Sequence, residues 1–179
     1  MQAFCRRCQL KPIGHLESRG GSQKHSGDLL SYTFRKAVPE DAPTCVVVRG
    51  KTRENSFSVE QLKSIGVTVD SWRAGIKDGS FPGHVCLHAD EIIGYCFGEP
   101  ATGEIVVLAL LPEHESRGLG KKLLNMMVSD LKALGHRRLF LGCSSNPAVR
   151  SYGFYRHQGW RSTGTVDAAN DEVLELIVG

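Results

Sequence analysis

Residues 103–124, GEIVVLALLPEHESRGLGKKLL, constrain the fold more than any other stretch of the chain. Seven apolar residues at 105–111 form a run long enough for a buried central strand. Pro112 ends that strand because proline has no backbone N–H to donate to a sheet ladder. Apolar residues at helical spacing follow, and Gly135 would end this helix. The sequence therefore predicts a strand, a turn that contains two glycines, and a helix.

The two glycines of this turn, Gly118 and Gly120, favour an anion-binding turn at the start of the helix. Glycine lets the backbone approach a ligand closely, and the first N–H groups of a helix have no acceptor within it. The helix dipole adds to the attraction for phosphate. Two glycines alone are more often turn or packing residues. The stretch also lacks the G-x-x-x-x-G-K-[ST] of a nucleotide P-loop and the third glycine of a dinucleotide-binding turn.

Composition narrows the class of protein. A chain of 179 residues with 41% hydrophobic and 23% charged residues fits one globular domain. The net charge of +3 arises in residues 1–31, and the remaining 148 residues hold seventeen basic and seventeen acidic side chains. A neutral domain offers no electrostatic reason for nucleic-acid binding, and no apolar run is long enough for a membrane span. The six cysteines lack a disulfide framework, so we expect reduced thiols and a cytoplasmic location.

The first thirty residues differ from the rest of the chain. They contain several glycines, few apolar residues and no periodic pattern, so we expect a poorly structured N-terminal extension at 1–30 and one folded domain at 31–179. Cys5 and Cys8, with His15 and His25 downstream, lack the H-x3–5-H spacing of a zinc finger. We therefore predict an incidental cysteine pair and no metal site.

The remaining pattern predicts a mixed α/β (α+β) domain. Asp70 and Asn146 are predicted helix N-caps, the latter with Pro147 at the first helical position. Trp72 is either a wall of a binding cleft or a core anchor. Strands are predicted at 32–37, 84–89, 92–98, 105–111, 138–143, 160–166 and 173–178, and helices at 39–53, 58–65, 71–77, 119–134 and 148–158.

Two segments resemble motifs of the GNAT superfamily of acetyl-CoA-dependent N-acetyltransferases. Residues 117–120, Arg-Gly-Leu-Gly, resemble the end of its Q/R-x-x-G-x-G/A motif, and residues 146–148 with 154–160 resemble its N-x-x-A…Y-x-x-x-G-F segment. Glu115 stands where the family usually has Gln or Arg, and Trp160 replaces Phe. The resemblance covers about residues 31–178. It implies the GNAT fold, a mixed and mostly antiparallel sheet that is splayed at the acetyl-CoA strand and flanked by helices.

The resemblance also implies the chemistry, in which a primary amine attacks the thioester of acetyl-CoA directly in a ternary complex. The pantetheine arm would lie along the central strand, where the family has a bulge. Asn146 would contact that arm, and the alternative role of Asn146 is that of a helix cap alone. The implied residues for the diphosphate are Ser116, Arg117, Gly118, Leu119, Gly120 and Lys121, and those for the pantetheine are Leu108, Ala109 and Leu110.

A base is useful because an amine with a pKa near 10.4 costs roughly 4.6 kcal/mol to neutralise near pH 7. Glu104 lies thirteen residues before Arg117, which is the offset of the catalytic glutamate in the histone acetyltransferase branch of the superfamily. The alternative is a strand-end glutamate that faces solvent. His88 and Glu99 are weaker candidates for the base.

The leaving thiolate needs a proton donor, and a tyrosine with a pKa near 10 stays protonated at neutral pH. Tyr155 matches the family tyrosine by its offset of four residues from Gly159. Tyr152 lies one helical turn away and is not expected to act.

Three functions follow as hypotheses: an N-acetyltransferase, an acyl-CoA-binding module without turnover, and a protein-interaction domain that uses the Trp72 region and the basic tail. The expected partners are acetyl-CoA and either a small-molecule amine or a protein amino group, without nucleic acid or membrane. A homodimer remains open, and so does the identity of the amine, because a fold does not define its acceptor.

Overall fold

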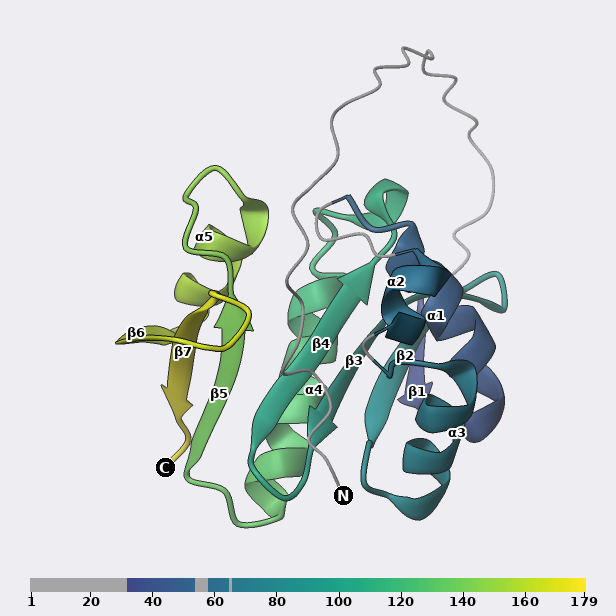
Figure 1. The fold of residues 1–179 in the computed structure, drawn as a ribbon, viewed down its shortest axis with the longest axis horizontal. Coiled ribbons are helices and arrows are strands. Elements are labelled where there is room, and N and C mark those ends of the chain that lie inside the picture. Colours follow the sequence, from purple (N-terminus) through teal and green to yellow (C-terminus); the bar gives the residue numbers. More distant parts are fainter. Residues whose placement is uncertain (1–31, 54–57, 65) are drawn as a thin grey trace.

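The computed structural model describes residues 32–53, 58–64 and 66–179, so the expectations for residues 1–30 lie outside it. Its strands form one sheet in the order β1-β2-β3-β4-β5-β7-β6 (Figure 1). All neighbouring pairs are antiparallel except β4 with β5, which confirms the mixed, mostly antiparallel sheet. The strands are β1 (Thr33–Lys36), β2 (Gly83–His88), β3 (Glu91–Glu99), β4 (Glu104–Leu110), β5 (Arg138–Cys143), β6 (Arg161–Val166) and β7 (Glu172–Ile177).

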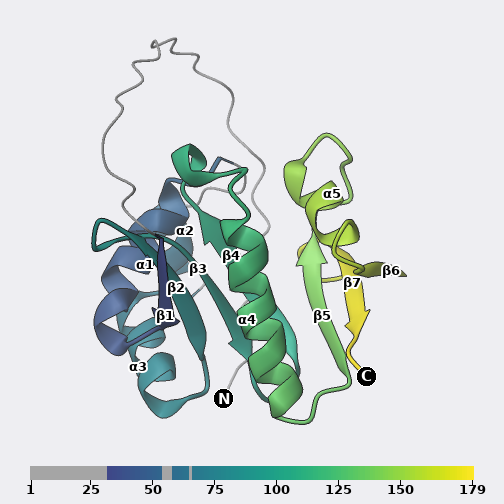
Figure 2. The same cartoon turned by 180° about the vertical axis from the view of Figure 1, so that it is seen from behind.

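Helices cover both faces of this sheet. α1 and α3 lie on one face with α2 beside α1, while α4 crosses the opposite face and α5 lies beyond the end of β5 (Figures 1 and 2). The helices are α1 (Ala42–Gly50), α2 (Val59–Ser64), α3 (Val69–Asp78), α4 (Leu119–Ala133) and α5 (Arg150–Arg156), with short 3-10 helices η1 (Pro39–Asp41) and η2 (Pro112–His114). None of the helices in the described ranges is long and apolar enough to span a bilayer.

Among the described residues, the parallel strands β4 and β5 pair only near their starts. Glu104 pairs with Phe140, and the Phe140 N–H donates to the Gly103 carbonyl at 3.2 Å. Within the described residues no further pair joins the two strands, and Figure 1 shows them diverging toward their C-terminal ends. The sheet is therefore splayed beside β4, as the resemblance to the GNAT fold implied.

A β-bulge lies near the start of β4. The register with β3 shifts between Phe97 and Gly98, so that Val107 and Ile105 have partners while Val106 has none. An extra residue of this kind bends the strand that carries it and increases its twist. The family resemblance implies a bulge on this strand beside the pantetheine residues 108–110, and the structure places one earlier, at Val106.

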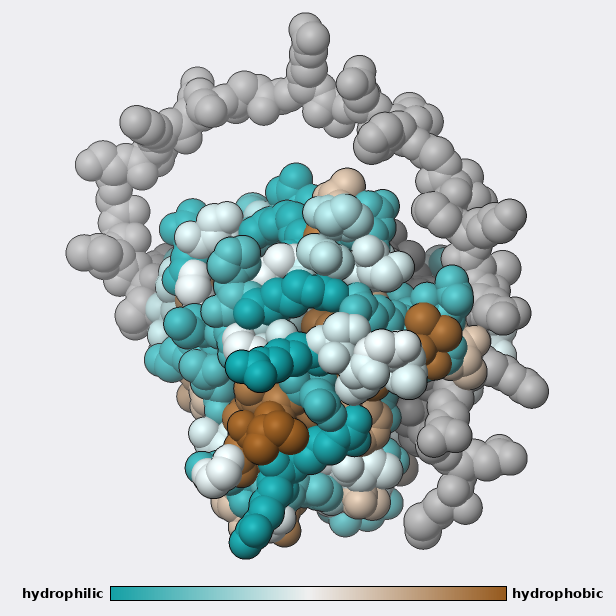
Figure 3. Space-filling view, turned by 90° about the vertical axis from the view of Figure 1, so that its left-hand side faces the viewer, coloured by the Kyte–Doolittle hydropathy of each residue, from teal (hydrophilic) through white to brown (hydrophobic). Residues whose placement is uncertain are grey.

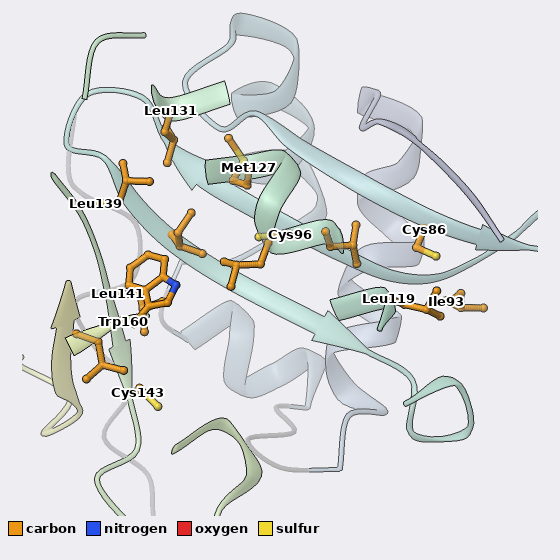
Figure 4. Close-up of a cluster of buried hydrophobic side chains, with 14 residues drawn as sticks. Cys86, Ile93, Cys96, Leu119, Met127, Leu131, Leu139, Leu141, Cys143 and Trp160 are labelled. Carbon is orange, nitrogen blue, oxygen red and sulfur yellow. The ribbon is translucent and has the colours of Figure 1, made fainter. Parts of the chain in front are cut away.

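The core has two parts, one on each face of the sheet. Under α4, the apolar stripe of that helix packs against β3, β5 and Trp160 (Figure 4). Under α1 and α3, Trp72 is 4% exposed, and its ring lies 5.2 Å from Phe97 and 5.6 Å from Tyr95. Trp72 is thus a core anchor and not the wall of a cleft. The α4 stripe consists of Leu119, Leu123, Leu124, Met127 and Leu131.

The structure corrects the predicted N-cap of α3. The Thr68 Oγ1 accepts the Ser71 N–H at 3.0 Å, so α3 begins at Val69 with Thr68 as its cap. Asp70 falls in the first turn instead, and there its carboxylate pairs with Arg73. Asp70 also suits this place because an acidic side chain is favourable near the positive end of the helix dipole.

The start of α5 is also later than predicted. The Asn146 Oδ1 accepts the Ala148 N–H at 2.9 Å, which closes a local turn. The helix then starts at Arg150 with Val149 at the cap position, so Asn146 is not its N-cap. Asparagine binds its own backbone two residues on in many turns, and here that bond competes with the cap.

Figure 3 views the side of the molecule that carries β6 and β7. This surface is mostly hydrophilic, with separate hydrophobic patches. Val166 and Ile177 are 62% and 67% exposed in these two strands.

An ion pair between Arg35 and Asp41 holds η1 and α1 against β1. Both Asp41 oxygens accept from Arg35, at 2.6 and 2.8 Å, and the Val38 N–H donates to the same carboxylate at 2.8 Å. Burial alone would raise the pKa of Asp41, but the hydrogen bonds from Arg35 and Val38 outweigh it and lower that pKa. The charged form is therefore favoured in the folded protein.

We predict that Asp41→Asn lowers the free energy of unfolding by about 1–3 kcal/mol at pH 7, because the charged hydrogen bonds are lost. Since folding depresses this pKa, its contribution is present above the unfolded value, near 4, and disappears as the pH falls through the folded value. Urea unfolding of the variant and wild type across pH measures this. Asp70→Asn is the control, since its side chain is 93% exposed. A constant deficit down to pH 2 would contradict the assignment.

Candidate functional site

The loop between β4 and α4 presents consecutive backbone N–H groups. Ser116 and Gly118 have φ angles of +62° and +78°, and the first hydrogen bond of α4 runs from the Lys122 N–H to the Gly118 carbonyl at 3.0 Å. In the described part of the chain, the N–H groups of residues 116–121 have no acceptor. Such a turn at a helix N-terminus attracts anions.

The two glycines of this loop have different roles. Gly118 has no neighbouring atom within 4 Å of a Cβ position, so its left-handed φ, and not crowding, favours glycine. A Cβ at Gly120 would lie 3.7 Å from the Phe154 ring of α5 and 4.0 Å from Leu108 of β4. Gly120 therefore brings the start of α4 close to elements on both sides of the splay.

The three residues predicted to contact the pantetheine lie on β4, and their side chains are divided between the two cores. Leu108 and Leu110 are half-buried and pack toward the α4 core. Ala109 is buried in the core under α1 and α3. Because β4 has no partner in β5 beyond Glu104, the β4 edge that faces β5 keeps unpaired backbone groups among the described residues.

Glu104 lies at the closed end of the splay. It is the first residue of β4, half-buried, and it pairs with Glu99 in β3 as well as Phe140 in β5. Strand alternation places it opposite Ile105, whose side chain enters the α4 core, and so on the face of α1 and α3. From Glu104 to Leu110 the strand spans about 20 Å, which separates the carboxylate from the loop.

The other candidate bases lie in different places. His88 ends β2 beside η2, where its ring stacks on Tyr32 at 4.7 Å and meets His114 at 5.2 Å. It is therefore near the loop end of β4 and far from Glu104. Glu99 lies directly opposite Glu104, and its carboxylate accepts the Thr102 hydroxyl at 2.6 Å.

The two tyrosines of α5 have different surroundings. The Tyr155 ring packs edge-on against Phe154 and Trp160 beside the α4 core. Burial raises the pKa of the Tyr155 phenol, so this hydroxyl stays protonated at neutral pH. Tyr152 instead lies under the guanidinium of Arg156, whose Cζ is 3.7 Å from the ring centroid.

Asn146 is exposed in the turn before α5. Its side-chain oxygen is already engaged by the Ala148 N–H, which leaves its NH2 group available as a donor. The local turn holds this side chain outside the helix, near the C-terminal end of β5.

Sequence reasoning missed two arginines that meet at the loop. The Glu115 carboxylate, 17% exposed, pairs with Arg53 at 3.2 Å from Nε to Oε2 and also with Arg150. Arg150 also reaches the Ser116 hydroxyl, at 3.5 Å. The only signal in the sequence was the carboxylate of Glu115 at a position where the family has Gln or Arg. Partners 62 and 35 residues away in the chain leave no local pattern.

A shallow hollow of about 370 Å³ lies on the outer face of α4. It touches the loop only through Gly118 and Lys121 and is separate from the splay of β4 and β5. Across the described ranges, no three His, Cys, Asp or Glu side chains gather as a metal site, and the four cysteines there are buried free thiols.

Comparison with known proteins agrees with this geometry. The model of the acetyltransferase (GNAT) family matches residues 52–160, more than half of the chain. No curated protein sequence matches significantly. Among solved structures, a putative GNAT acetyltransferase from Desulfovibrio desulfuricans is 24% identical, with a TM-score of 0.70 over 83% of this chain and 100% of that one.

Two further neighbours were solved with coenzyme. The PaiA N-acetyltransferase of Thermoplasma acidophilum, in complex with coenzyme A, is 20% identical, with a TM-score of 0.70 over 83% of this chain and 99% of that one. YncA of Salmonella typhimurium, a putative acetyltransferase with acetyl-CoA, is 16% identical, with a TM-score of 0.64 over 83% and 95%. At these identities the neighbours establish the fold, while the family model covers both the loop and α5. The chain belongs to the GNAT family of acetyltransferases.

Proposed function

We propose that this protein is an N-acetyltransferase that moves the acetyl group of acetyl-CoA to a primary amine by direct attack. The amine belongs either to a small molecule or to a protein amino group. The observation that carries the proposal is the splay of β4 from β5, with six N–H groups at its open end that have no acceptor among the described residues. A donor with an anionic head and an extended, amide-containing arm is complementary to both features.

The coenzyme would bind along this splay. The N–H groups of Ser116, Arg117, Gly118, Leu119, Gly120 and Lys121 would hold its diphosphate. The pantetheine amides would pair with the open edge of β4 at Leu108, Ala109 and Leu110, as an added strand pairs with a sheet edge. The NH2 group of Asn146 is a further donor to this arm.

The reacting groups would meet toward the closed end. Glu104 takes a proton from the amine, directly or through water, and the amine nitrogen attacks the thioester carbonyl carbon. A backbone N–H near the Val106 bulge stabilises the developing oxyanion. When the C–S bond breaks, the Tyr155 hydroxyl gives its proton to the thiolate, since a tyrosine phenol is protonated at neutral pH and can donate.

The related structures support a coenzyme of this class. The T. acidophilum and S. typhimurium neighbours carry coenzyme A and acetyl-CoA, respectively. An acyl-CoA-binding module without turnover is the second candidate, because the loop and splay serve binding as well as catalysis. The interaction-domain hypothesis loses its main feature, since Trp72 is buried.

We predict that the wild-type protein binds acetyl-CoA and releases its thiol in the presence of at least one amine in a panel of amino acids, polyamines and peptide N-termini. Calorimetry measures binding, and a thiol reagent measures release against an amine-free control. Binding without release across the panel would favour the binding module. Absence of binding would overturn both readings.

We predict that Tyr155→Phe lowers kcat with little change in the Kd for acetyl-CoA, because the hydroxyl acts mainly as the thiolate leaves. Tyr152→Phe is the matched control in the same helix and should lower kcat less than Tyr155→Phe does. Steady-state kinetics and calorimetry of both variants test this. Equal or reversed effects would show that another group protonates the thiolate.

We predict that Glu104→Gln lowers the rate at neutral pH by about 10²–10⁴-fold, the usual cost of losing a general base. The deficit should shrink as the pH rises toward the pKa of the amine, because more of the substrate is then already neutral. The pH–rate profiles of wild type and variant measure this, with Glu99→Gln as the control from the facing strand. Two profiles of the same shape and height would remove Glu104 from the mechanism.

A further inference from the structure

Three side chains from separate parts of the chain converge at the coenzyme loop. Arg53 follows α1, Glu115 precedes α4, and Arg150 begins α5. The two arginines pair with the same carboxylate oxygen, Oε2 of Glu115. We call these three residues the arginine clamp.

The clamp has an excess of positive charge. Its two guanidinium groups pair with one carboxylate, so the three side chains together carry a net charge of +1. The Glu115 side chain is 17% exposed, whereas those of Arg53 and Arg150 are 56% and 51% exposed. The cations therefore reach solvent while the anion lies beneath them, and a dissolved anion would meet the cations first.

The chemistry of these side chains is suited to phosphate. A guanidinium carries five N–H donors in a planar fork that matches two oxygens of a phosphate. Arg150 lies against the loop itself, with Nη2 3.5 Å from the Ser116 hydroxyl. Its fork thus lies next to the N–H groups of residues 116–121, which have no acceptor in the described part of the chain.

We propose that Arg150, assisted by Arg53, is a phosphate-binding residue for the coenzyme, and that Glu115 orients both arginines before the coenzyme binds. This inference rests on the proposed function because its ligand is a phosphate group of the coenzyme. It also explains how a carboxylate is tolerated beside an anion site: Glu115 faces two cations and not the ligand.

The test measures Kd by calorimetry for wild type, Arg150→Met, Arg150→Lys and Arg53→Met. Arg150→Met should weaken coenzyme A binding tenfold or more, about 1.4 kcal/mol. The Kd of Arg150→Lys should lie between those of wild type and Arg150→Met, because lysine keeps the positive charge and lacks the planar fork of donors. Arg53→Met should have a smaller effect, since Arg53 contacts only Glu115 among the loop residues.

Arg138→Met is the matched control. The Arg138 side chain is also 51% exposed and also pairs with a glutamate, Glu175, but it lies at the far end of β5. Its Kd for coenzyme A should stay within twofold of wild type. S-acetylpantetheine, which keeps the arm and lacks every phosphate, should show the same kcat/KM with wild type and Arg150→Met.

A second ligand identifies the phosphate. If Arg150→Met weakens 3′-dephospho-coenzyme A as much as coenzyme A, the clamp binds the diphosphate, and if that penalty disappears, it binds the 3′-phosphate. Either result supports the proposal. Wild-type affinity in Arg150→Met, or an equal loss with S-acetylpantetheine, would overturn it. Failure of the wild-type protein to bind coenzyme A would instead overturn the proposed function.

Discussion

Among the residues that the structure describes, a single backbone pairing, between Glu104 and Phe140, determines where the sheet opens. Had β4 and β5 paired along their length, each strand edge would have been satisfied by the other. The bulge at Val106 bends β4 just after this pair, and the two strands separate. The core under α4 still joins them, because Ile105 of β4 and Leu139 of β5 are buried in one cluster with Leu123 of α4. The opening is thus a stable feature of the fold.

The loop at the open end combines features that are each weak alone. Two residues with left-handed φ and a helix start leave the N–H groups of 116–121 without acceptors in the described part of the chain. In water such groups cost little, but an anion placed there gains several hydrogen bonds and the helix dipole together. The acidic Glu115 would oppose this effect if it faced the ligand, and its two arginine partners remove that conflict.

The central strand, the turn with two glycines and the order of the elements could be predicted because their signals are local, whereas the splay followed only from the resemblance to the GNAT family. Each of these signals needs only a short stretch of sequence. They are an apolar run that ends at Pro112, a Gly-x-Gly turn, and apolar residues at helical spacing. The helix starts were less predictable, since Thr68 and Asp70 are both good caps, and Asn146 could close either a helix or a turn. The contacts of Glu115 with Arg53 and Arg150 could not be predicted, because they depend on how distant segments meet.

The contacts of Glu115 have a mechanical consequence. Arg53 follows α1, beside the half of the sheet formed by β1, β2, β3 and β4. Arg150 begins α5, beside the half formed by β5, β6 and β7. The carboxylate between them therefore ties the two halves together at the open end, as the Glu104–Phe140 pair does at the closed end. Partly exposed ion pairs are individually weak and are screened by salt. These ion pairs can accordingly break and re-form at a small cost in free energy. The open end of the splay can therefore widen and narrow, while the backbone pair at the closed end keeps the two strands together there.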